Sequence, residues 1–101
     1  YPKSHRTFAD YFKEKGHEVL EDGMPRIDLP EPPVMITGKA GDVVLTHHQI
    51  VHGAGPNTSP HIRYAAITRL RHKDCEENGS DAYIDIWREW PGVKEALEVT
   101  A

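Results

Sequence analysis

The feature that most constrains this chain is a pair of β-branched, apolar runs separated by a loop rich in glycine and proline. Residues 43–52 and 62–70 form the runs, and residues 53–60, Gly-Ala-Gly-Pro-Asn-Thr-Ser-Pro, form the loop. Valine, isoleucine and threonine favour extended backbone, whereas glycine, proline, asparagine and serine favour turns. A shorter run at 34–36 precedes them across a Gly-containing turn. The sequence therefore predicts antiparallel strands in the middle of the chain.

Helical patterns flank these predicted strands. Residues 5–15 carry three aromatic side chains at i, i+3, i+4 spacing, with Ser4 as a candidate N-cap and Gly16 as the residue that ends the helix. Asp81 can cap a second helix, whose apolar side includes two tryptophans that we expect to anchor the C-terminal region. Pro91 interrupts that pattern, and a third short helix can begin after it.

Length and composition bound the range of functions. With 101 residues, of which 38% are hydrophobic, the chain is one domain at most, and residues 1–101 are either that domain or a C-terminal fragment of a longer one. Because the first residue is Tyr1 and a helical pattern follows at once, we expect a fragment.

The net charge of −4 and the lack of a basic stripe argue against a nucleic-acid or membrane partner. The single cysteine and the lack of a long apolar stretch predict a soluble, cytoplasmic protein.

Histidines are concentrated at the end of the first β-rich run. Three of the seven, His47, His48 and His52, fall within six positions. On a strand, alternation places His48 and His52 on one face together with Thr46. On a helix, the same spacing would resemble a zinc pair of a hydrolase, but the glutamate of a His-Glu-x-x-His sequence is missing.

The segment around His52 resembles the signature of the phytanoyl-CoA dioxygenase family. That signature runs His-Gly-Ser-Gly-x-Asn-x-Ser and ends in an arginine, and here Arg63 follows His52 by eleven positions. The resemblance spans residues 38–72, and Ser4-His5-Arg6 is similar to a Gly-Ser-His segment that lies earlier in the family. Position 54 is alanine where the family often has serine.

The resemblance implies a mainly β fold with flanking helices, as part of a double-stranded β-helix of the jelly-roll, cupin-like type. It also implies an Fe(II)- and 2-oxoglutarate-dependent dioxygenase, which couples oxidative decarboxylation of 2-oxoglutarate to hydroxylation of a small-molecule substrate. In that family His52 would be an iron ligand and Arg63 would anchor the far carboxylate of 2-oxoglutarate through its planar fork of donors. Thr46, which strand alternation places on the same face as His52, could be a further co-substrate contact.

One part of the family site is missing. The first histidine and the carboxylate form a His-x-Asp or His-x-Glu sequence, and none lies between Tyr1 and His47. The sequence His72-Lys73-Asp74 follows Arg63, which is the wrong order, and we expect it to form a solvated turn. We therefore expect the missing N-terminal half, or a second copy, to complete the barrel. The alternative is a non-catalytic cupin-like module that binds a metal or another ligand.

Overall fold

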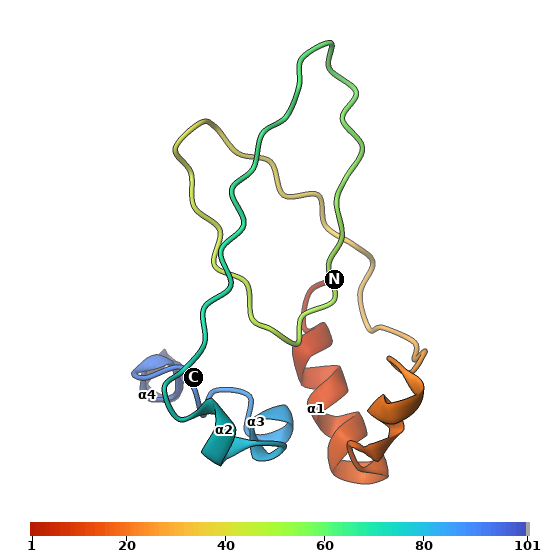
Figure 1. Ribbon diagram of the computed structural model, residues 1–101, viewed down its shortest axis with the longest axis vertical. Coiled ribbons are helices and arrows are strands. Elements are labelled where there is room, and N and C mark those ends of the chain that lie inside the picture. The colour runs from red at the N-terminus through yellow and green to blue at the C-terminus, as the bar shows by residue number, and fades with distance from the viewer. Residues whose placement is uncertain (101) are drawn as a thin grey trace.

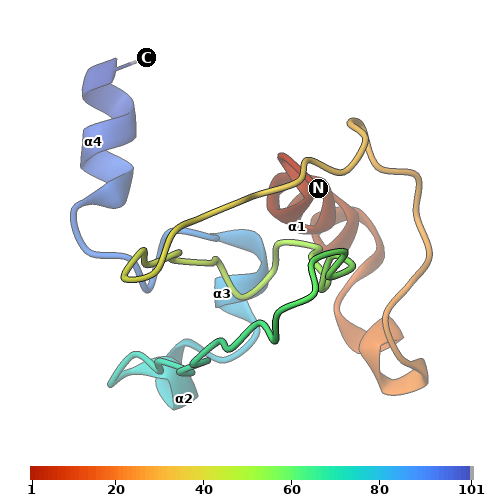
Figure 2. The same ribbon diagram turned by 90° about the horizontal axis from the view of Figure 1, so that it is seen from above.

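The computed structural model describes residues 1–100, and a helical base with two long loops makes up this part of the chain. Its elements are α1 (Ser4–Lys15), the 3-10 helix η1 (Glu18–Asp22), α2 (Cys75–Asn78), α3 (Asp81–Ile84) and α4 (Val93–Thr100). Figure 1 shows α1, α2 and α3 at the base, with the loops rising above them. In Figure 2, α4 stands to one side of the other helices. Among the described residues, the helices are all too short or too polar to cross a membrane.

The predicted first helix is confirmed as α1. Phe8 and Phe12 are 4% and 2% exposed, and Gly16 ends the helix with φ 82°, donating its N–H to the carbonyl of Phe12 at 2.9 Å. A positive φ favours glycine because it has no Cβ to clash. The predicted N-cap is wrong, however. Lys3 occupies that position without a side-chain cap, and Ser4 is the first residue of the helix.

The small core lies where α1 packs against α3. The ring centroids of Phe12 and Tyr83 are 5.5 Å apart, and Ala82 of α3 is 7% exposed. The second predicted helix is shorter than expected, because α3 ends at Ile84 and both tryptophans lie beyond it in turns. The third predicted helix is confirmed as α4. Burial of aromatic side chains is the main stabilising contribution in this base.

The prediction of a mainly β, jelly-roll fold is wrong for this structure, since residues 1–100 contain no strand. The runs at 34–36, 43–46 and 62–70 have no regular secondary structure and rise in the loops of Figure 1 without pairing. A strand is stable only when its N–H and C=O groups bond a neighbouring strand, and no neighbour is present here. The helical zinc pair is also not formed, because residues 47–50 make a turn in which Ile50 N–H donates to His47 at 3.1 Å.

Candidate functional site

His47 is buried at the centre of the helical base. Its Nε2 lies 2.6 Å from the carbonyl oxygen of Ile86, and its Nδ1 lies 3.1 Å from the backbone nitrogen of Gln49. A carbonyl only accepts, so Nε2 carries the proton and Nδ1 accepts the amide hydrogen. Both ring nitrogens are therefore occupied. His47 therefore links Ile86 to the turn at Gln49, and it has no free lone pair with which to bind a metal.

Aromatic and histidine rings surround His47. Its ring stacks on that of His48 at 4.3 Å and on that of Trp90 at 5.7 Å, and the rings of His5 and Trp87 lie 5.4 Å and 5.2 Å away. Trp87 and Trp90 thus anchor the C-terminal region, as predicted. Burial, with a further contribution from His47, holds the pKa values of His5 and His48 below their ordinary value of 6.5. The surroundings favour neutral imidazoles.

Gln49 joins α1 to α3. Its side chain is buried, and its Nε2 donates to the carbonyl of His5 at 3.0 Å and to that of Tyr83 at 2.9 Å. No local pattern identifies this residue from the sequence, because its partners are 44 and 34 positions away. His47 and Gln49 are buried and His48 is exposed, but this difference arises in a turn and not on the predicted strand.

His52, the predicted iron ligand, is exposed at the end of this anchored segment. Its Nδ1 lies 2.8 Å from the carbonyl oxygen of Ile50, so Nδ1 carries the proton and the lone pair is on Nε2. A histidine that binds a metal through one nitrogen commonly donates its other N–H to a carbonyl. His52 and His48 both line one cavity of about 550 Å³. The apolar part of its lining consists of Phe8, Met24, Pro25, Ile27, Leu29, Ile50 and Val51.

Arg63 and Thr46 lie outside the lining of this cavity. Arg63 is exposed, and its Nη1 donates to the carbonyl of Gly55 at 3.1 Å, which ties the two limbs of the glycine-rich loop. Thr46 is exposed as well. The structure thus brings His52 and His48 to one cavity, while the two predicted co-substrate contacts stand apart from it.

The loop between His52 and Arg63 is held by its own side chains. Asn57 donates from Nδ2 to the carbonyl of His61 at 2.6 Å, and its Oδ1 accepts the backbone N–H of Ser59 at 3.1 Å. These bonds close a turn at the tip of the loop.

Further metal ligands are missing from this part of the chain. Within residues 1–100, no three histidine, cysteine, aspartate or glutamate side chains gather into a group that could hold a metal ion. At the His72-Lys73-Asp74 sequence, the backbone N–H of Asp74 donates to Nδ1 of His72 at 3.1 Å, and residues 73 and 74 form the predicted turn. The ring of His52 has the right tautomer for a ligand, but the rest of a metal centre is not assembled around it.

A protein-family model matches the part of the chain that contains the candidate site residues. The model of the phytanoyl-CoA dioxygenase family matches residues 1–65, which is more than half of the chain and includes Thr46, His52 and Arg63. No curated protein and no solved structure matches the chain. The chain therefore belongs to the phytanoyl-CoA dioxygenase family.

Proposed function

We propose that this chain carries part of the iron and co-substrate site of an Fe(II)- and 2-oxoglutarate-dependent dioxygenase. Members of its family generally depend on both of these cofactors. The observation that supports the proposal most is the His52 ring, which donates from Nδ1 to Ile50 and carries its lone pair on Nε2 beside an apolar cavity. That is the protonation state in which an imidazole binds a divalent metal.

In this proposal two residues have separate roles. His52 would hold the iron through Nε2, and Arg63 would receive the far carboxylate of 2-oxoglutarate. The guanidinium has five N–H donors, and the bond to Gly55 uses one nitrogen, so the others remain for a carboxylate. Thr46 would add a hydroxyl contact to the co-substrate. When bound, iron and 2-oxoglutarate would use dioxygen for the oxidising chemistry, in which one oxygen atom hydroxylates a C–H bond of the substrate, the other enters succinate, and 2-oxoglutarate loses carbon dioxide.

We further propose that the other two iron ligands come from polypeptide outside these 101 residues. The expected iron site needs two histidines and one carboxylate. The family supplies the other two ligands from a His-x-Asp or His-x-Glu sequence that precedes the second histidine, and none lies before His47 in this chain.

The large exposed area of the chain supports the proposal that further polypeptide packs against it. The described structure exposes 8771 Å², whereas a compact monomer of 11.4 kDa exposes about 5,800 Å². Val43, Tyr64, Ile67 and Leu70 are each more than four-fifths exposed, at 83%, 85%, 87% and 83%. Apolar side chains exposed in such numbers support the proposal that further polypeptide covers this part of the chain.

Turnover of 2-oxoglutarate by the native protein tests the proposal. We expect Arg63→Ala to raise the KM for 2-oxoglutarate by about 10- to 100-fold, because charged hydrogen bonds to a carboxylate are lost. His52→Ala should abolish release of labelled carbon dioxide from 2-oxoglutarate. Arg69→Ala is the matched control, since it removes another exposed arginine from the same run.

Two results would contradict the proposal in different ways. An unchanged KM in Arg63→Ala would remove this residue from the co-substrate site. A native protein that consumes no 2-oxoglutarate in the presence of Fe(II) would leave the non-catalytic binding module as the better hypothesis.

A further inference from the structure

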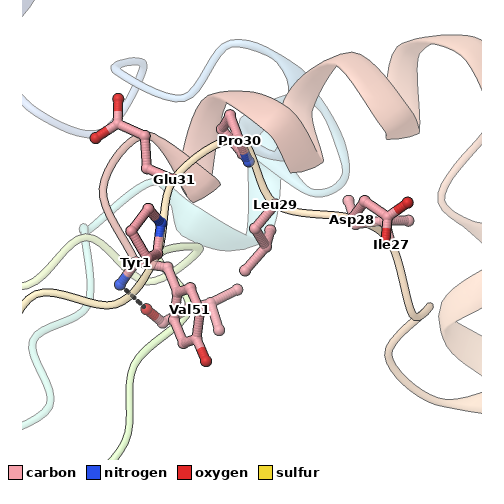
Figure 3. Close-up of a pocket in the computed structure, with 8 residues that line it drawn as sticks. Tyr1, Ile27, Asp28, Leu29, Pro30, Glu31 and Val51 are labelled. Atoms are coloured by element: carbon pink, nitrogen blue, oxygen red, sulfur yellow. Dashed lines mark hydrogen bonds between the residues drawn. The ribbon is translucent and has the colours of Figure 1, made fainter.

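The backbone immediately before His52 is held by the first turn of α1. Ser4 is fully buried at 0% exposure, and its Oγ accepts the backbone N–H of Val51 at 2.8 Å while donating its own proton to the carbonyl of Tyr1 at 2.8 Å. The nitrogen of Tyr1 donates to the carbonyl of Val51 at 3.0 Å, and Figure 3 shows this bond. Both backbone polar groups of Val51 are therefore bonded, one by Ser4 and the other by Tyr1.

The bond from Ser4 acts on the peptide unit that controls the His52 ring. The N–H of Val51 and the carbonyl of Ile50 belong to one planar trans peptide, in which the two groups point in opposite directions. Because Ser4 holds the N–H on one side, the carbonyl is directed to the other side, where it lies 2.8 Å from Nδ1 of His52.

We propose that Ser4 is a positioning residue for His52, which it keeps in the tautomer with the proton on Nδ1 and the lone pair on Nε2. Neutral histidine in water favours the opposite tautomer, so the protein must impose this one. The inference deepens the proposed function and rests on it for the role of His52 as a metal ligand. The tautomer itself can be measured with no metal present.

Nitrogen NMR of the labelled, metal-free native protein at about pH 8, where ordinary imidazoles are neutral, is the decisive experiment. In the wild type, we expect the His52 nitrogens to report a protonated Nδ1 and an unprotonated Nε2. Ser4→Ala should shift the ring to the population found in water and speed hydrogen exchange of the Val51 amide by about tenfold. Thr7→Ala is the control, since it removes another α1 hydroxyl that bonds a backbone carbonyl, that of Lys3 at 3.4 Å.

A second variant guards against loss of folding. Ser4→Cys keeps nearly the same volume but offers a weak sulfur acceptor, so we expect a partial shift of the His52 tautomer with α1 intact. Retention of the wild-type tautomer in either folded variant would overturn the inference, as would a wild-type ring that already carries its proton on Nε2. Failure of the proposed function would give a different result. Ser4→Ala would still shift the His52 tautomer, but the wild-type protein would consume no 2-oxoglutarate.

Discussion

The Nε2 atom of His47 donates to the carbonyl of Ile86 at 2.6 Å, across 39 positions of sequence. His47 lies in the part of the chain that matches the family model, and Ile86 lies beyond it. This bond therefore joins the segment that leads to His52 to the C-terminal helical region. The C-terminal region supports the candidate site although it contributes no residue to it.

Replacing His47 by phenylalanine tests how much these hydrogen bonds stabilise the fold. His47→Phe keeps an aromatic ring in the stack but leaves the Ile86 carbonyl and the Gln49 N–H without partners. We expect the free energy of unfolding to fall by about 3 kcal/mol, because each buried unsatisfied group costs about 1–3 kcal/mol. Urea denaturation followed by circular dichroism measures the change. His61→Phe, at an exposed position, should change it by less than about 0.5 kcal/mol, and equal losses in the two variants would contradict the assignment.

Gln49→Glu preserves the shape of the side chain and reverses its hydrogen-bonding character. An ionised glutamate would face the carbonyls of His5 and Tyr83 with acceptors only. We expect a loss of about 3–5 kcal/mol at neutral pH, as for a buried uncompensated charge, and a smaller loss in acid as the carboxylate gains a proton. Asn57→Asp is the matched control, because it changes an exposed amide that also donates to a carbonyl, and it should cost about 1 kcal/mol. Denaturation midpoints at two pH values check both.

The stability of the base should depend on pH through His5. Its folded pKa is held below 6.5 by burial, by His47 and by Arg6. The unfolded chain therefore binds protons more readily, so the stabilising contribution is complete above pH 6.5 and is lost as the pH falls from there through the folded pKa. His48 acts in the same direction, because burial and His47 lower its pKa while Glu89 opposes the shift.

Thermal unfolding at a series of pH values measures this dependence. His5→Phe should flatten the decline below pH 6.5, which is the ordinary value of the pKa, whereas His61→Phe should not. A decline of unchanged steepness in His5→Phe would show that other groups cause it.

Core and loop positions should differ sharply in their sensitivity to truncation. Phe12→Ala removes a ring that is 2% exposed, and we expect a loss of about 3–5 kcal/mol. Val43→Ala alters a side chain that is 83% exposed and should change the stability of the 101-residue chain by less than about 0.5 kcal/mol. Chemical denaturation of both variants provides the comparison. A large effect of Val43→Ala would mean that this side chain is buried in the folded chain.

Features that depend on neighbouring residues were predictable from the sequence. The helix at Ser4–Lys15 follows from its aromatic spacing and from Gly16, and the turn tied by Asn57 and Ser59 follows from their side-chain chemistry. The spacing between His52 and Arg63 indicated the family, which the family model confirms. In each case the relevant partners lie within about a dozen positions.

The tertiary structure decided everything that joins distant segments. The β-branched runs formed no strands, since a strand requires a partner and residues 1–100 provide none beside them. The sequence suggested Ser4 as a helix cap, and strand alternation placed His48 on the face of His52 without indicating what His47 contacts. In the structure Ser4 bonds Val51, 47 positions away, and both nitrogens of His47 are bonded. Local propensity acts along the chain, whereas burial and hydrogen-bond partners depend on which distant segments meet.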